Sequence, residues 1–222
     1  MATAPQVALV DYGAGNLRSV AKALERSGLG VDVTSDPAAL RRADAVVLPG
    51  VGAFRDARAS LGTKGLDEAV LASIAGGRPY LGLCLGLQLL YDEAEEHGVT
   101  PGFGLLHGRV ERFPNRDRDG KRLLVPHIGW NEVRWNRSGS AHPMLAALPE
   151  RDHYYFVHSY RAVPQGAATV VGTADYGGDF AAAVAHEKIF AVQFHPEKSQ
   201  AAGKRLLDAF AQWVAACRGG EG

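Results

Sequence analysis

The residue types best suited to covalent chemistry lie where a predicted strand meets a predicted helix. The segment Gly82-Leu83-Cys84-Leu85-Gly86 has the glycine spacing of a hydrolase nucleophile elbow, with Cys in place of Ser. The glycines permit a tight turn that exposes the thiol, and the N–H groups at the start of the helix stabilise a thiolate. An inert buried cysteine is the alternative, but the paired glycines favour a nucleophile.

A nucleophilic cysteine needs a base, and the base needs an orienting group. Phe194-His195-Pro196-Glu197 supplies both within four residues. In an extended segment, residues i and i+2 point the same way, so Glu197 can accept the second ring N–H of His195 and set its tautomer. A histidine that merely ends a strand, with Glu197 in solvent, is the alternative. With Cys84, the motif predicts a Cys–His–Glu triad.

A second glycine-rich turn, Pro49-Gly50-Val51-Gly52, follows another predicted strand. Ligands of open α/β sheets bind outside the carboxyl ends of the strands, so this loop is expected beside Cys84. The N–H of Leu85 and an N–H from Val51 or Gly52 could then form an oxyanion hole. Glycine turns after strands are common, which leaves a purely structural loop as the alternative.

Alternating short apolar runs and helical patterns in the first half predict the elements that hold these groups. Strands are predicted at Gln6–Val10, Val31–Thr34, Ala45–Leu48 and Pro79–Leu83. Helices are predicted after Asn16, after Asp36, and over Arg55–Leu61, Leu66–Ala75 and Leu85–Glu93. Gln88 lies one helical turn past Cys84 and is expected on the same face, where its amide can hydrogen-bond a substrate. The order predicts an α/β fold, with a mainly parallel central sheet covered by helices on both faces.

The second half is predicted to be rich in β-strands. Short strands are expected from Leu105 to Phe194, with one brief helix near His142–Leu148 and a hairpin turning at Glu187-Lys188. The alternating charges of Asn115–Arg122 predict a solvated hairpin tip. A closing amphipathic helix contains Leu206, Leu207, Phe210 and Val214. No repeat or linker is present, so residues 1–222 are predicted to form a single domain.

The composition excludes several classes of function. The 222 residues carry 24 Lys and Arg against 24 Asp and Glu, so no positive field favours nucleic acid or an anionic membrane. No apolar run is long enough to span a bilayer, and Met1–Asp11 lacks the basic region of a signal peptide. The two cysteines form neither a disulfide framework nor a zinc site, which favours a reducing cytoplasm.

Motifs for metals and phosphate-bearing cofactors are also missing. After the first strand, Gly13-Ala14-Gly15 begins like a dinucleotide loop, but Arg18 stands where a third glycine is needed. No phosphate loop and no His-Glu-x-x-His spacing occur, so no cofactor and no metal are expected. Cys217 has no local activating partner.

The motifs around Cys84 and His195 resemble those of the class I, triad-type glutamine amidotransferases, a flavodoxin-like family. Further blocks resemble the glutaminase subunits of imidazole glycerol phosphate synthases in histidine biosynthesis. These blocks are Asp11-Tyr12-Gly13-Ala14-Gly15-Asn16, Pro49-Gly50-Val51-Gly52-Ala53-Phe54, Pro126-His127-Ile128-Gly129-Trp130-Asn131 and His158-Ser159-Tyr160. They run through residues 11–199 in the family order. The charged Asn115–Arg122 stretch departs from the pattern and is expected to be a variable loop.

The resemblance implies that Cys84 attacks the side-chain amide of glutamine, with His195 as base and acid and Glu197 orienting it. Residues resembling the glutamine-holding positions are Gln88, Glu96, Ser159 and Tyr160. Helical geometry from Cys84 would instead favour Glu95 over Glu96. The oxyanion hole is expected from the Leu85 N–H and the Val51–Gly52 region.

The resemblance also implies a partner, a (β/α)-barrel cyclase subunit in a heterodimer. It would use the ammonia to make imidazole glycerol phosphate and an aminoimidazole carboxamide ribotide. Trp130, Asn131 and Lys198 resemble residues that face this partner. The alternatives are a glutaminase subunit of another biosynthetic amidotransferase, a stand-alone cysteine hydrolase or peptidase, and a catalytically silent binding subunit.

Overall fold

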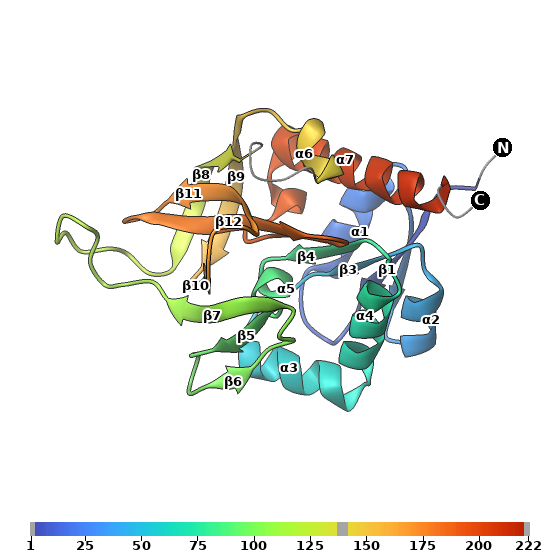
Figure 1. Cartoon of the computed structure of the whole chain (residues 1–222), viewed down its shortest axis with the longest axis horizontal. Coiled ribbons are helices and arrows are strands. Elements are labelled where there is room, and N and C mark those ends of the chain that lie inside the picture. The colour runs from blue at the N-terminus through green and yellow to red at the C-terminus, as the bar shows by residue number, and fades with distance from the viewer. Residues whose placement is uncertain (1–2, 137–141, 220–222) are drawn as a thin grey trace.

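A nine-stranded sheet forms the centre of the computed structural model, which describes residues 3–136 and 142–219 (Figure 1). Its first five strands, in spatial order, are parallel: β2 (Gly30–Thr34), β1 (Gln6–Val10), β3 (Ala45–Leu48), β4 (Tyr80–Leu83) and β13 (Ile189–Val192). Antiparallel strands continue it: β12 (Asp179–His186), β11 (Val170–Asp175), β8 (His127–Trp135) and β9 (Arg151–His158). The predicted parallel α/β core and the β-rich second half are confirmed.

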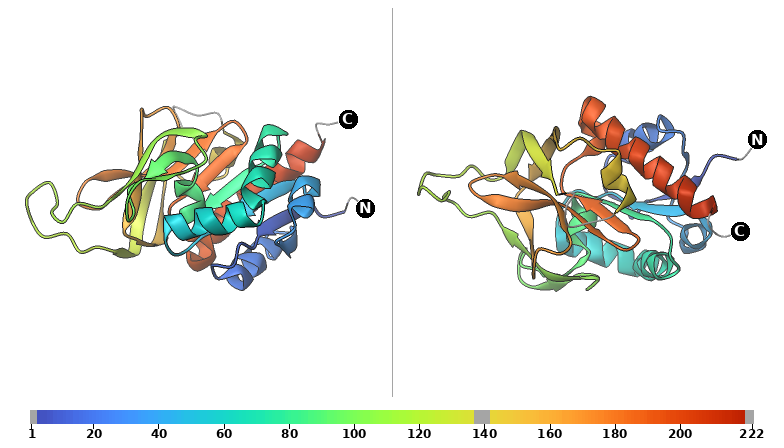
Figure 2. Two further views of the ribbon diagram at one scale, coloured as in Figure 1. Left: turned by 90° about the horizontal axis from the view of Figure 1, so that it is seen from below. Right: turned by 45° about the horizontal axis from the view of Figure 1, so that its top comes forward.

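Helices cover both faces of the parallel part (Figure 2). One face carries α1 (Leu17–Glu25), α6 (Pro143–Ala146) and α7 (Gln200–Gly219). The other carries α2 (Pro37–Arg42), α3 (Phe54–Thr63) and α4 (Leu66–Ala75). Along β1, Val7 and Leu9 belong to the apolar cluster of the first face, whereas Ala8 and Val10 belong to that of the second. A strand buried on both faces shows the continuous apolar run expected in a parallel sheet.

A second, four-stranded sheet packs on the face that carries α3 and α4. Its order is β10 (Tyr160–Pro164), β7 (Leu106–Arg112), β5 (Tyr91–Ala94) and β6 (Thr100–Pro101). The predicted helix over Leu85–Glu93 is therefore wrong beyond its first turn, since α5 spans only Leu85–Gln88. The N–H groups of Phe103 and Leu105 donate to the carbonyls of Leu89 and Leu90. These carbonyls therefore do not accept the helical hydrogen bonds that would continue α5. Tertiary hydrogen bonds here override the local helical pattern.

The Asn115–Arg122 segment projects from the body of the molecule in every view (Figures 1 and 2). Its ends are joined by an antiparallel bridge between Arg116 and Arg122. The N–H of Asp117 donates to the carbonyl of Lys121 at 2.9 Å, which closes the tip. The predicted exposed hairpin is confirmed.

Candidate active site

Cys84 occupies a strained turn between β4 and α5. Its backbone has φ 51° and ψ −101°, a region that non-glycine residues rarely adopt. A Cβ on Gly86 would lie 2.0 Å from the carbonyl oxygen of Leu48, and one on Gly82 would lie 2.6 Å from the carbonyl oxygen of Gly86. Both elbow positions therefore require glycine. Because α5 is a single turn, it offers a thiolate the free N–H groups at its start and not the dipole of a long helix.

His195 and Glu197 form a buried pair beside this turn. The His195 Nδ1 lies 2.9 Å from Glu197 Oε1, and their side chains are 5% and 3% exposed. The predicted extended segment is corrected in part, because Pro196–Lys198 is a 3-10 turn that begins directly after an extended His195. The hydroxyl of Ser199 donates to the carbonyl of His195 at 2.6 Å and accepts the N–H of Tyr155, which ties the turn to β9.

The charge state of His195 is set by its neighbours. Burial disfavours the imidazolium, but the Cys84 thiol and the Glu197 carboxylate outweigh burial and raise the pKa of His195 to about 10. The second ring nitrogen, Nε2, is buried and makes no hydrogen bond within the described part of the chain, so it is available to the thiol. At neutral pH this arrangement favours an imidazolium beside Cys84.

A cavity of about 340 Å³ opens in front of the thiol, within the ~300–1,000 Å³ range of small-ligand sites. It is lined by Val51, Gly52, Cys84, Leu85, Gln88, Glu96, Pro126, Val157, His158, Ser159 and Tyr160. All the residues that the sequence suggested for the oxyanion hole and for substrate binding are among them. The structure thus brings these positions together with the nucleophile.

The candidate oxyanion hole lies at the carboxyl ends of β3 and β4. Leu85 is the first residue of α5, so its N–H has no acceptor within that helix. Behind the loop, sequence reasoning missed Tyr12, whose buried hydroxyl lies 2.8 Å from where a Cβ on Gly50 would stand. Burial raises the pKa of Tyr12 to about 12, an effect that the backbone of Val51 partly offsets and the Cys84 thiol reinforces. Tyr12 therefore stays a neutral phenol.

Glu96 reaches the cavity by a route that helical geometry did not predict. Because β5 replaces the predicted helix, the geometric preference for Glu95 is wrong: its carboxylate lies 3.4 Å from Arg109. Glu96 Oε2 accepts the N–H of Phe54 at 2.7 Å and caps α3, whose N-cap Ala53 has no side-chain acceptor. This contact holds the carboxylate at the edge of the cavity.

Sequence reasoning also missed Gln193, a fully buried side chain in contact with the nucleophile. Its Nε2 donates to Cys84 Sγ at 3.4 Å, and its Oε1 accepts Gln88 Nε2 at 3.1 Å. The signal available was its position two residues before His195, where side chains in an extended segment point the same way.

The three predicted partner-facing residues lie on β8 and on the turn after His195. Trp130 is 48% exposed and packs edge-on against Tyr155, with ring centroids 6.2 Å apart. Lys198 Nζ lies 5.7 Å from the centre of the same ring. Asn131 differs, because its amide nitrogen donates a hydrogen bond within the chain, to the carbonyl of Asp175 at 2.8 Å.

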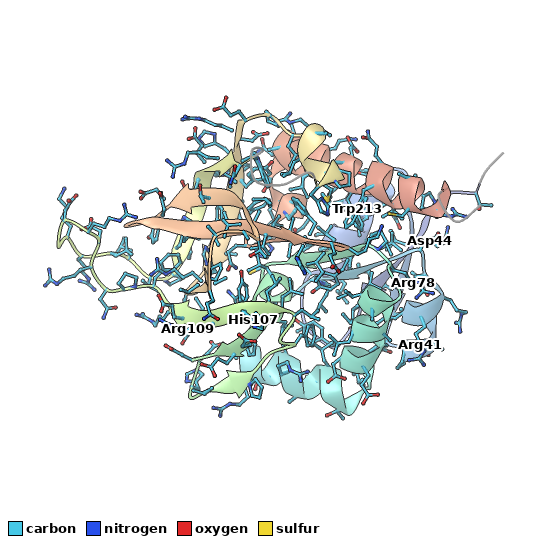
Figure 3. The ribbon with its side chains drawn as sticks, viewed as in Figure 1. Arg41, Asp44, Arg78, His107, Arg109 and Trp213 are labelled. Carbon is cyan, nitrogen blue, oxygen red and sulfur yellow. The ribbon has the colours of Figure 1, made fainter. Side chains whose placement is uncertain are left out.

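A larger cavity lies away from this chemistry, at the amino ends of the parallel strands. It measures about 770 Å³, and its lining includes Asp44, Arg78 and Trp213, which Figure 3 labels on the side of the molecule near α2, α4 and α7. It contains Cys217 but none of the predicted site residues. Size alone would therefore have selected a cavity that holds none of the predicted site residues.

Residues 3–136 and 142–219 contain no helix long and apolar enough to cross a membrane. Over the same two ranges, no group of three or more His, Cys, Asp or Glu side chains could hold a metal ion.

The fold and the Cys–His–Glu arrangement define a class of protein, and comparison agrees. Residues 8–213 match the class I glutamine amidotransferase family, so the chain belongs to that family. It is 51% identical to the imidazole glycerol phosphate synthase subunit HisH of Methylococcus capsulatus, over 93% of this chain and 96% of that one. It is 48% identical to the subunit of the same name from Syntrophotalea carbinolica, over 92% of this chain and 98% of that one.

Solved structures share the fold at low sequence identity. The PurLQS structure from Thermotoga maritima has a TM-score of 0.71 at 20% identity, covering 95% of this chain and 99% of that one. The glutaminase domain of CTPS from Trypanosoma brucei has a TM-score of 0.65 at 20% identity, covering 96% and 94%.

Proposed function

We propose that this chain is the glutaminase subunit of an imidazole glycerol phosphate synthase, with Cys84, His195 and Glu197 as its catalytic triad. The observation that carries the assignment of the triad is a strained cysteine that lines the cavity and lies beside a buried His195–Glu197 pair. The relatives at about half identity along nearly their whole length support the particular synthase.

The geometry suits hydrolysis of a side-chain amide. Cys84 Sγ attacks the amide carbon of glutamine, and the oxyanion that forms is stabilised by the N–H of Leu85 and the Val51–Gly52 loop. His195 gives its proton to the departing nitrogen, so that ammonia leaves and a thioester remains. His195 then takes a proton from water, whose oxygen attacks the thioester and releases glutamate. Glu197 keeps the imidazole oriented through both steps.

The polar groups at the edge of the cavity suit the amino-acid end of glutamine. One carboxylate oxygen of Glu96 accepts the N–H of Phe54, and the other is left to bind the ammonium group of the substrate. The amide nitrogen of Gln88 donates to the carbonyl of Tyr160 and to Gln193 Oε1. Its own Oε1 is therefore left to accept a hydrogen bond from the substrate. Ser159 and Tyr160 also line the cavity.

The ammonia is transferred to a (β/α)-barrel cyclase subunit, which uses it to make imidazole glycerol phosphate and an aminoimidazole carboxamide ribotide in histidine biosynthesis. Transfer within a complex protects it, because ammonia released into water at neutral pH becomes non-nucleophilic ammonium. Exposed apolar side chains on β8 suit a protein partner: Ile128 is 59% exposed and Trp130 48%. The two lie two residues apart in the strand and so share one face.

Labelling tests the assignment directly. We expect diazo-oxo-norleucine, an electrophilic glutamine analogue, to modify Cys84 alone when the chain is mixed with its cyclase partner and the partner's substrate. Mass spectrometry of the digest locates the adduct, and excess glutamine should protect against it. Cys217, which is partly exposed, is the internal control. An unlabelled Cys84 in the complete complex would favour a silent binding subunit instead.

Trp130→Ala is expected to weaken binding of the cyclase subunit by about 2 kcal/mol or more, because aromatic side chains dominate interface energies. Titration calorimetry of the two subunits measures the change. Trp213→Phe, a buried substitution on α7, is the control and should leave the affinity unaltered. Equal affinities for Trp130→Ala and the unmodified chain would place the interface elsewhere.

A further inference from the structure

Polar side chains outside the triad form a continuous line from β8 to the nucleophile. Their order is Asn131, His127, His158, the carbonyl of Tyr160, Gln88, Gln193 and Cys84. The two histidines are 3% and 7% exposed, Gln88 is 5% exposed and Gln193 is fully buried. Buried polar groups are costly unless their hydrogen bonds are satisfied, so the direction of each bond in the line is constrained.

The carbonyl of Tyr160 sets the direction on the histidine side. A carbonyl oxygen only accepts, so the His158 Nδ1, 2.8 Å away, must carry the proton. Burial lowers the pKa of His158 to about 3 and that of His127 to about 4, so both rings are neutral. The Nε2 of His158 is then an acceptor, and His127 Nδ1 donates to it across 3.1 Å.

The hydrogen bonds at the Asn131 end of the line independently require the same tautomer of His127. The carbonyl of Asp175 only accepts, so the amide nitrogen of Asn131, 2.8 Å away, is correctly placed as the donor. Its second hydrogen points to His127 Nε2 at 3.4 Å, which must therefore be an acceptor. Two carbonyls at opposite ends thus require the Nδ1–H tautomer of both histidines.

The same carbonyl of Tyr160 orients the two glutamines. Gln88 Nε2 donates one hydrogen to it at 2.9 Å and the other to Gln193 Oε1 at 3.1 Å. The amide of Gln193 is thereby turned so that Nε2 donates to Cys84 Sγ at 3.4 Å. If Gln193 flipped, two amide nitrogens would face each other and the sulfur would face an oxygen.

We propose that Gln193 is a further catalytic residue, which donates a hydrogen bond to the thiolate of Cys84, and that the line from Asn131 to Gln88 consists of positioning residues that hold this donor in place. The proposal rests on the glutaminase function proposed above. A donor fixed beforehand stabilises the sulfur anion without reorganisation during the reaction. It adds to the imidazolium of His195 on the same atom.

Substitution of Gln193 tests the donor. The measurements are kcat and KM for glutamine in the complete complex and, in a Cys217→Ser background, the rate of Cys84 alkylation by iodoacetamide at fixed pH. Gln193→Glu keeps the shape but presents an oxygen to the sulfur. We expect it to lower both the alkylation rate and kcat by roughly 10- to 100-fold, with KM changed less than about threefold. Gln193→Met removes the donor without adding charge and is expected to have the smaller effect.

The direction of the alkylation change separates the proposal from loosened packing. A merely disturbed core would expose Cys84 and raise its alkylation rate, whereas loss of a donor to the thiolate lowers it. An alkylation rate that is unchanged or raised in Gln193→Glu overturns the proposal. Because alkylation needs neither glutamine nor the partner, this outcome is distinct from failure of the glutaminase assignment, which the diazo-oxo-norleucine experiment reports.

The positioning line has a spectroscopic signature. We expect long-range ¹H–¹⁵N spectra of the full chain to show protonated Nδ1 and unprotonated Nε2 for both His127 and His158, the rarer neutral tautomer. A protonated Nε2 on either ring overturns the proposed line of hydrogen bonds.

Substitution of His158 tests the same line by activity. In His158→Asn the side-chain amide can still donate to the carbonyl of Tyr160, whereas in His158→Gln it cannot. The kcat of the Gln variant should therefore be about tenfold lower than that of the Asn variant. Equal kcat values for the two variants would also contradict it.

Discussion

Replacing Cys84 with alanine is expected to lower glutamine-dependent synthesis by the two-subunit enzyme on the order of 10,000-fold or more, because the proposed thioester forms on the sulfur that the change removes. The loss should appear in kcat, since the walls of the proposed glutamine cavity remain. The assay is formation of imidazole glycerol phosphate by the reconstituted complex. Alanine at position 84 must also adopt the positive φ of this turn, which is strained for a residue with a side chain. Circular dichroism should therefore confirm that the variant is folded.

Two controls make the result specific to the glutaminase step. Ammonium salts added at alkaline pH should restore synthesis by the Cys84→Ala complex, because free ammonia reaches the cyclase without the thioester. Cys217→Ala, which removes the other cysteine, should retain glutamine-dependent activity. If added ammonia failed to restore synthesis, the division of labour between the subunits would be refuted.

Glu197→Gln is expected to lower the glutaminase kcat by roughly 100- to 10,000-fold with little change in volume. The carboxylate accepts the Nδ1–H of His195 at 2.9 Å and, with the Cys84 thiol, raises the pKa of that ring to about 10. An amide can turn its NH₂ toward Nδ1, which moves the ring proton to Nε2 and removes the acceptor that the second half-reaction needs. Glutamine turnover by the complex measures the loss.

The sign of the accompanying pH effect follows from the same pair. Without the carboxylate the pKa of His195 falls below about 10, so the imidazolium is lost at lower pH than in the unmodified chain. Histidine ring shifts followed by NMR against pH report this midpoint. Glu25→Gln, an exposed change on α1, is the matched control and should alter neither kcat nor the midpoint. An unmoved midpoint in Glu197→Gln would contradict the pairing.

Much of the fold could be predicted because its signals are local. Continuous apolar runs such as Ala45–Leu48 and the stripe on α1 encode strands and helices within a few residues. The helix predicted to Glu93 fails for the opposite reason. Its leucine pattern stops at Leu90, and the chain then enters β5, because the carbonyls of Leu89 and Leu90 accept hydrogen bonds from N–H groups in residues 103–106. The placement of Glu96 depended on that choice.

The sequence alone predicts Cys84, His195 and Glu197 as nucleophile, base and orienting acid, because glycine spacing and i, i+2 geometry act over a handful of residues. Only the tertiary structure decided how these groups are held and what else touches them. Gln193 reaches Cys84 across 109 residues of sequence, and His127 reaches His158 across 31. No local pattern encodes such pairings. They follow from burial, where each donor must find an acceptor, and two backbone carbonyls then orient a whole line of side chains.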